Sequence, residues 1–125
     1  YADKGSLEEA YMWCEKALEK DGSCIAAHYI MSMVYEERQL LKKALESLRK
    51  TIYYDCTFVP GYFLIGNLCQ RLGELHEAKK YYRQALKLLE SKNENEIIPF
   101  LDDLSVREAL TMIQTLLGND TAVKE

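Results

Sequence analysis

Residues 59–90, VPGYFLIGNLCQRLGELHEAKKYYRQALKLLE, decide the fold. Apolar and small side chains recur at spacings of three and four in each half of this stretch, which places them on one face of a helix. Between the halves stands Gly73, the kind of residue that ends a helix in a left-handed conformation. Small residues at Gly66 and Ala78 would let the two backbones approach closely, so the stretch predicts an antiparallel helix pair. The two stripes are formed by Tyr62, Ile65, Gly66 and Cys69, and by Ala78, Tyr82, Ala85 and Leu89.

The same pattern occurs three times at intervals of 34 residues. The segments GSLEEAYMWCEKALE, QLLKKALESLRKTIY and GELHEAKKYYRQALK begin at Gly5, Gln39 and Gly73 and align without a gap. A helix–turn–helix unit that recurs at this period resembles the tetratricopeptide repeat (TPR). The resemblance implies an all-α fold, a solenoid of helix–turn–helix units (an α–α superhelix) with a C-terminal capping helix.

The whole chain, residues 1–125, is expected to form a single TPR domain, because its length suits one hydrophobic core. After residue 92 the repeat pattern stops, and a later amphipathic segment is expected to cover the apolar face of the last repeat. The expected parts are the second helix of a repeat at 5–22, complete repeats at 25–58 and 59–92, a loop at 93–104 and a capping helix at 105–117.

Several local signals predict where the helices begin and end. Ser6 and Ser105 are each followed three residues later by a glutamate, a pattern that caps the start of a helix. We therefore expect the first helix to run over about residues 7–20. Gly118 is expected to end the last helix. The apolar run IIPFL at 97–101 is expected to lie against the last repeat.

The charge balance argues against a nucleic-acid partner. Lys and Arg number 16 and Asp and Glu 20, a net charge of −4, whereas phosphate binding needs a concentrated basic face. No apolar run approaches the roughly 18–20 residues of a membrane span, and no signal-peptide pattern opens the chain. We therefore expect a cytoplasmic protein without membrane insertion. The first repeat has only its second helix, so we expect a piece of a longer protein, in which the apolar face at 7–18 could pair two copies.

No group of residues predicts catalysis. The four cysteines have spacings that match no metal-binding pattern, and two of them, Cys14 and Cys69, fall on expected buried faces. The only histidines, His28 and His76, have no partner typical of a catalytic pair. A glycine-rich phosphate loop is also missing. We expect no catalytic, cofactor-binding or metal-binding residue and no enzymatic activity in this chain.

A binding groove is the better candidate for a functional site. The first helices of stacked pairs line the concave side of a solenoid. There Tyr29, Met33 and Phe63 would form an apolar floor, and polar side chains a rim, which suits an extended peptide or a helix of a partner protein. The alternative is that the run 97–101, or another part of the protein, fills the groove. The predicted groove residues are Tyr29, Met33, Glu36, Glu37, Phe63, Asn67, Gln70 and Arg71.

A second resemblance covers a little over half of the chain. Residues 51–90, then a polar loop and residues 97–117, are similar to the C-terminal repeat region of CheR-type chemotaxis receptor methyltransferases. The departures from that pattern are Cys56 for Pro, Gly61 and Tyr62 for Ala and His, and Gln84 for Asn. The matching residues are Tyr54, Asp55, Phe58, Phe63, Gly66, Asn67, Leu68, Arg71, Gly73, Ala78, Tyr82, Arg83, Ala85, Leu86, Leu88 and Leu89, followed by Pro99, Asp103, Leu104 and Ser105.

This resemblance implies a protein-interaction module attached to a methyltransferase that modifies receptor glutamates with S-adenosylmethionine. The cofactor and catalytic groups would belong to a domain N-terminal to this sequence, so none is carried onto these residues. The implied partners are a chemotaxis receptor, another chemotaxis component or the parent's own methyltransferase domain. The alternative is a generic scaffold in another multiprotein complex. A chaperone clamp for a C-terminal carboxylate is disfavoured, because Tyr29 and Met33 stand where such a clamp needs polar or basic groups.

Overall fold

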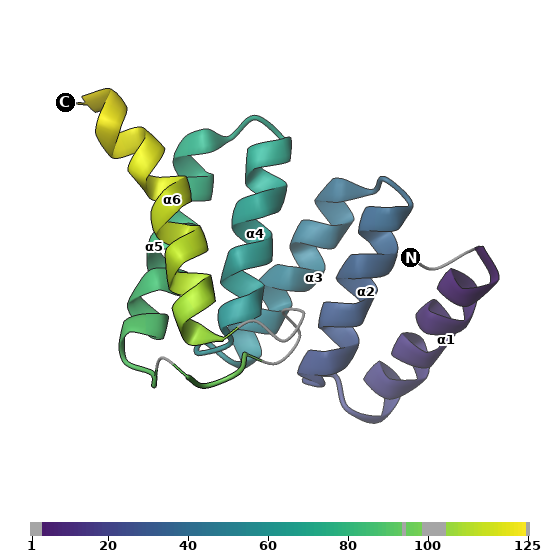
Figure 1. Cartoon of the computed structure of the whole chain (residues 1–125). Coiled ribbons are helices and arrows are strands. Elements are labelled where there is room, and N and C mark those ends of the chain that lie inside the picture. Colours follow the sequence, from purple (N-terminus) through teal and green to yellow (C-terminus); the bar gives the residue numbers. More distant parts are fainter. Residues whose placement is uncertain (1–3, 94, 99–104, 125) are drawn as a thin grey trace. The chain divides into compact units, whose positions relative to one another are not determined.

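The computed structural model describes residues 4–93, 95–98 and 105–124, and nearly all of them lie in helices or short turns (Figure 1). The described residues form an α–α helical repeat fold, as the sequence predicts. Its second and third predicted repeats each begin with a 13-residue helix. The helices are α1 (Lys4–Lys20), α2 (Ile25–Glu37), α3 (Leu41–Tyr54), α4 (Val59–Arg71), α5 (Leu75–Glu90) and α6 (Val106–Lys124).

Two predicted helix boundaries are wrong. α1 begins at Lys4, so Ser6 lies inside the helix and does not open it, since a capping residue needs a non-helical backbone. α6 continues through Gly118 to Lys124. A glycine that stays in the right-handed conformation keeps its N–H in the helix, so it weakens the helix without ending it.

The capping box predicted at the start of α6 is confirmed. The backbone N–H of Glu108 donates to Oγ of Ser105 at 3.2 Å, and the N–H of Ser105 donates to Oε1 of Glu108 at 3.0 Å. These two bonds satisfy backbone donors that have no partner inside the helix. The backbone N–H and the hydroxyl of Ser105 also hold the pKa of the Glu108 carboxyl below its ordinary value, the backbone N–H being the larger cause.

The helices α2 and α4 end in the same way, at positions one repeat apart. Gln39 and Gly73 both have a positive φ, 63° and 83°. In each turn the residue that follows donates its backbone N–H to the carbonyl oxygen five residues back, at 2.8 Å. This bonding pattern, with a left-handed residue after the helix, is the Schellman motif. The prediction that Gly73 ends its helix is therefore confirmed.

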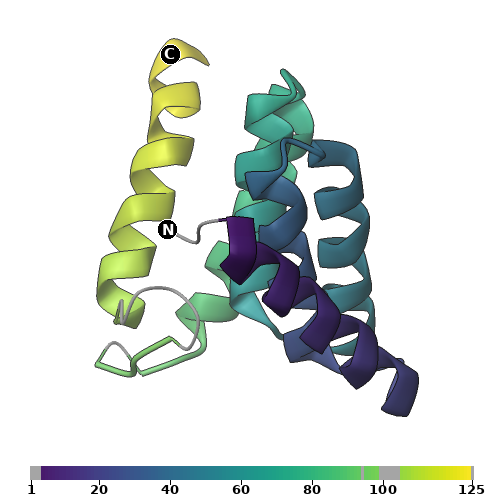
Figure 2. The same ribbon diagram turned by 90° about the vertical axis from the view of Figure 1, so that its right-hand side faces the viewer.

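The chain separates into two compact units, Tyr1–Gly61 and Tyr62–Glu125. In the first unit α2 packs against both α1 and α3 (Figures 1 and 2). Cys14, Ala27 and Met31 form an apolar cluster between α1 and α2. The division into one domain or two stays a prediction.

In the second unit α5 packs against α6 (Figure 1). Ile97 and Ser105 form an isolated antiparallel bridge, which brings the segment after α5 to the start of α6. Ile98 is buried, whereas the side chain of Ile97 is half exposed. Of the predicted contact of residues 97–101 with the last repeat, residues 99–101 lie outside the described part of the chain. The buried apolar side chains of the unit include Ile65, Cys69, Tyr82, Leu89, Val106 and Ile113.

Candidate protein-interaction site

The predicted groove residues of the first unit lie on α2, and one of them is not at the surface. Tyr29 is only 3% exposed, and its ring meets Phe58 edge-on with 5.5 Å between centroids. It is therefore a core residue and not part of an open groove floor. Met33 is 48% exposed, Glu36 is partly exposed and Glu37 is exposed. The α2 surface thus offers one apolar side chain beside two carboxylates.

The predicted groove residues of the second unit lie on α4. The side chain of Tyr82, from α5, contacts three of them. Phe63 is half-buried against Tyr82, with 6.0 Å between ring centroids. The phenol of Tyr82 donates to Oδ1 of Asn67 at 2.6 Å and lies 3.1 Å from Oε1 of Gln70. A phenol has a single hydrogen, so the shorter distance marks Asn67 as its main acceptor. The fourth residue, Arg71, is exposed.

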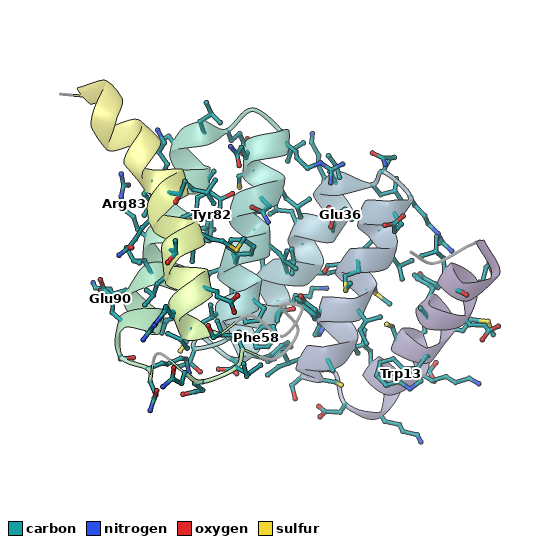
Figure 3. The ribbon with its side chains drawn as sticks, viewed as in Figure 1. Trp13, Glu36, Phe58, Tyr82, Arg83 and Glu90 are labelled. Atoms are coloured by element: carbon teal, nitrogen blue, oxygen red, sulfur yellow. The ribbon has the colours of Figure 1, made fainter. Side chains whose placement is uncertain are left out.

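Tyr82 was predicted as a packing residue, and the structure adds a polar role. Tyr82 is 2% exposed, and Figure 3 labels it among the helices of the second unit. Burial raises the pKa of the phenol, with the nearby Cys69 thiol as a smaller cause. The hydroxyl therefore stays protonated and able to donate over the neutral pH range. Asn67 and Tyr82 stand six residues before and nine residues after Gly73, and no pattern in the sequence pairs them.

Gly66 makes the close approach of Tyr82 to α4 possible. A Cβ at this position would lie 2.6 Å from Cε1 and 2.8 Å from Cδ1 of Tyr82, well inside van der Waals contact. The absence of a side chain therefore lets the ring rest on the helix backbone. The prediction that a small residue here allows the helices to approach is confirmed.

The side-chain amides that contact Tyr82 have further hydrogen-bond donors that a partner can use. Asn67 accepts the phenol hydrogen with its carbonyl oxygen, and both Asn67 and Gln70 retain an NH₂ group with two donors. Beside them Arg71 carries a guanidinium. This part of α4 presents donors and positive charge, which complement carbonyl or carboxylate oxygens of a peptide. The two sets of residues lie in different units, so a continuous groove formed by all eight stays a prediction.

The described residues contain no cluster of His, Cys, Asp and Glu that could hold a metal ion. Among the cysteines, all of them described, Cys14 and Cys69 are buried as predicted, and none takes part in a disulfide. Within the described helices, no segment is both long and apolar enough to cross a membrane.

Comparisons with known proteins identify one repeat in the chain and structures with a similar fold. Residues 59–90 match the family model described as the tetratricopeptide repeat. No curated protein matches the chain in sequence. A structure of PcrH in complex with the chaperone binding region of PopD resembles the chain with a TM-score of 0.76 and 16% identity, over 97% of this chain and 83% of that one.

Two structures of MamA are also similar, each with a TM-score of 0.66, 18% identity and 96% of this chain covered. The chain spans only 64% and 60% of the length of these MamA chains. At such identities the likeness shows the fold alone. The chain thus contains a tetratricopeptide repeat at residues 59–90 within an α–α helical repeat fold that it shares with PcrH and MamA.

Proposed function

We propose that this chain is the protein-interaction module of a chemotaxis receptor glutamate methyltransferase. The observation that carries the proposal is the resemblance to the CheR-type region, which continues past the last repeat as far as Ser105. A generic repeat has no reason to share that tail. Ser105 is also the residue that caps α6, so the resembling segment includes the start of the last helix.

The partner is a protein or peptide that contacts the exposed residues of α2 and α4. Met33 gives an apolar contact and Arg71 a charged one, while the NH₂ groups of Asn67 and Gln70 can donate to peptide carbonyls. PcrH shows that a protein of this fold can bind a segment of another protein. The candidates are a cytoplasmic part of a chemotaxis receptor, another chemotaxis component and the parent's own methyltransferase domain.

In this proposal the module itself transfers no methyl group. S-adenosylmethionine would be held by the catalytic domain of the parent protein, and this chain would bring that domain to its substrate in the cytoplasm. A second candidate function is that of an adaptor in a different multiprotein complex. It is favoured by the fold shared with PcrH and MamA, because that fold is not restricted to methyltransferases.

The test is a calorimetric titration of the purified chain with each of two defined probes. The probes are the C-terminal segment of a chemotaxis receptor and a receptor methyltransferase catalytic domain, both from the source organism. The variant Met33→Asp with Arg71→Glu changes the proposed surface. A matched control, Met12→Asp with Arg49→Glu, makes the same chemical changes at exposed positions on α1 and α3.

Binding of either probe, weakened about tenfold or more in the first variant and little changed in the control, is the expected result. Equal weakening in both variants would move the contact away from α2 and α4. If neither probe binds the unaltered chain, the chemotaxis assignment is overturned and the adaptor function takes its place.

A further inference from the structure

A cleft in the first unit is lined by none of the predicted groove residues. Its volume is about 190 Å³, and side chains of α1, α2 and α3 line it. The lining contains two lysines, a carboxylate and three further polar groups beside an apolar floor. The cleft residues are Leu18, His28, Met31, Tyr35, Lys43, Glu46, Ser47 and Lys50.

The cations of the cleft come from α3. Lys43 and Lys50 are seven residues apart in one helix, so their Cα atoms are about 10 Å apart along its axis. The ammonium group of Lys43 lies 5.9 Å from the ring centroid of Tyr35. Within the described part of the chain, neither lysine nor Glu46 takes part in an ion pair. The two ammonium groups are therefore open to an external anion.

The other polar groups of the cleft belong to Tyr35, Ser47 and His28. Burial is the largest cause that raises the pKa of the Tyr35 phenol, so its hydroxyl stays protonated. Ser47 is 7% exposed, and its hydroxyl can donate or accept. The Nε2 atom of His28 lies 2.8 Å from the carbonyl oxygen of Gly22, which ties the ring to the turn between α1 and α2. Two cations outnumber the single carboxylate of Glu46.

We propose that this cleft binds an acidic peptide segment whose carboxylates pair with Lys43 and Lys50. A peptide in the polyproline II conformation advances about 3.1 Å per residue with three residues per turn, so acidic residues three positions apart lie on one face and match the separation of the lysines. The apolar side chains of Leu18 and Met31 can accept an apolar residue placed between the two acids. The site uses none of the predicted groove residues, so this proposal can be tested independently of the proposed function.

The test follows backbone amide chemical shifts of the whole chain during titration with a capped peptide, Gly-Glu-Leu-Ala-Glu-Gly. A second peptide with Gln in place of both Glu residues is the ligand control. The variant Lys43→Gln with Lys50→Gln removes the two cations of the cleft. The matched variant Lys42→Gln with Arg49→Gln removes two cations of the same helix that do not line the cleft.

We expect saturable shifts at the cleft residues with the acidic peptide, and affinity at least about tenfold weaker in the Lys43 and Lys50 variant. The affinity of the Lys42 and Arg49 variant for the peptide should lie within about twofold of that of the unaltered chain. For both of these proteins, binding should weaken at high salt because salt screens the charges. All four substituted residues are exposed, and circular dichroism checks that both variants keep their helices.

Three results would overturn the proposal. The first is equal weakening in both variants, which would indicate a general charge effect. The second is the absence of saturable shifts, or equal binding of the Gln peptide. The third is self-association of the chain that depends on Lys43 and Lys50, which would assign the cleft to the acidic α1 of a second copy.

Discussion

At the scale of single residues, Gly66 is a position where the packing of the second unit leaves no room for a side chain. Replacing Gly66 by Ala places a Cβ 2.6 Å from the Tyr82 ring. Because the ring is buried and bonded to Asn67, it cannot move aside freely. We expect the free energy of unfolding in urea to fall by about 1–3 kcal/mol. Gly22→Ala is the control, since a Cβ there meets no atom within 4 Å. Equal effects of the two substitutions would contradict this account.

Tyr82 makes the free energy of unfolding depend on pH, and the substitution Tyr82→Phe isolates its contribution. The phenol has a raised pKa in the folded protein, so the folded state holds this proton more tightly than the unfolded state. The resulting stability is complete below the ordinary tyrosine pKa of 10.0 and is lost as the pH rises through the folded value. Tyr82→Phe removes the hydrogen bond to Asn67, which should cost about 1 kcal/mol at neutral pH.

The same variant should lose less stability than the unaltered chain when urea unfolding is repeated above pH 10, because it lacks the phenol that titrates. Substitution of the exposed Tyr53 by Phe is the control, and should leave the neutral-pH stability nearly unchanged. An identical alkaline decline in Tyr82→Phe and the unaltered chain would show that other groups cause it.

At the scale of the elements, the turn after α2 contains a residue in a strained backbone conformation that a substitution by glycine can relieve. Gln39 adopts φ 63° at the position where the next repeat has Gly73 with φ 83°. A residue with a Cβ is disfavoured there by about 1–2 kcal/mol, while glycine loses more backbone entropy on folding. We expect Gln39→Gly to stabilise the protein by about 0.5–1 kcal/mol, and Gly73→Ala to destabilise it by a similar amount, both measured in urea. Destabilisation by Gln39→Gly would show that the glutamine side chain makes a compensating contact.

The elements also show what the sequence could predict. The spacing of apolar residues predicted the helix pairs, because helical periodicity is a property of neighbouring residues. The boundaries at Ser6 and Gly118 were wrong because capping depends on the backbone conformation of one residue. In the site, the burial of Tyr29 depends on Phe58, which follows a different helix. Such contacts follow from how the helices pack, and no pattern within one helix shows them.

At the scale of the whole molecule, the cysteines provide four reporters of how the chain opens. Cys56 is exposed and Cys24 partly exposed, whereas Cys14 and Cys69 have no exposed surface. Burial raises the pKa of the Cys14 thiol to about 11, with the neighbouring Cys24 as a smaller cause, so its reactive thiolate is scarce in the folded protein. Alkylation by iodoacetamide should therefore modify Cys56 first, and Cys14 and Cys69 only through opening of the structure.

Because Cys14 lies in the first compact unit and Cys69 in the second, their labelling rates also test whether the chain is one domain. If both thiols are exposed only by cooperative unfolding of a single domain, they become reactive with the same free energy of opening. We expect equal values when modification of each cysteine is followed by peptide mass spectrometry over a urea series. Two different values would mean that the region around one thiol opens while the other stays closed, which would exclude a single all-or-none opening of the chain. Rapid modification of Cys14 without urea, at the rate of Cys56, would contradict its burial.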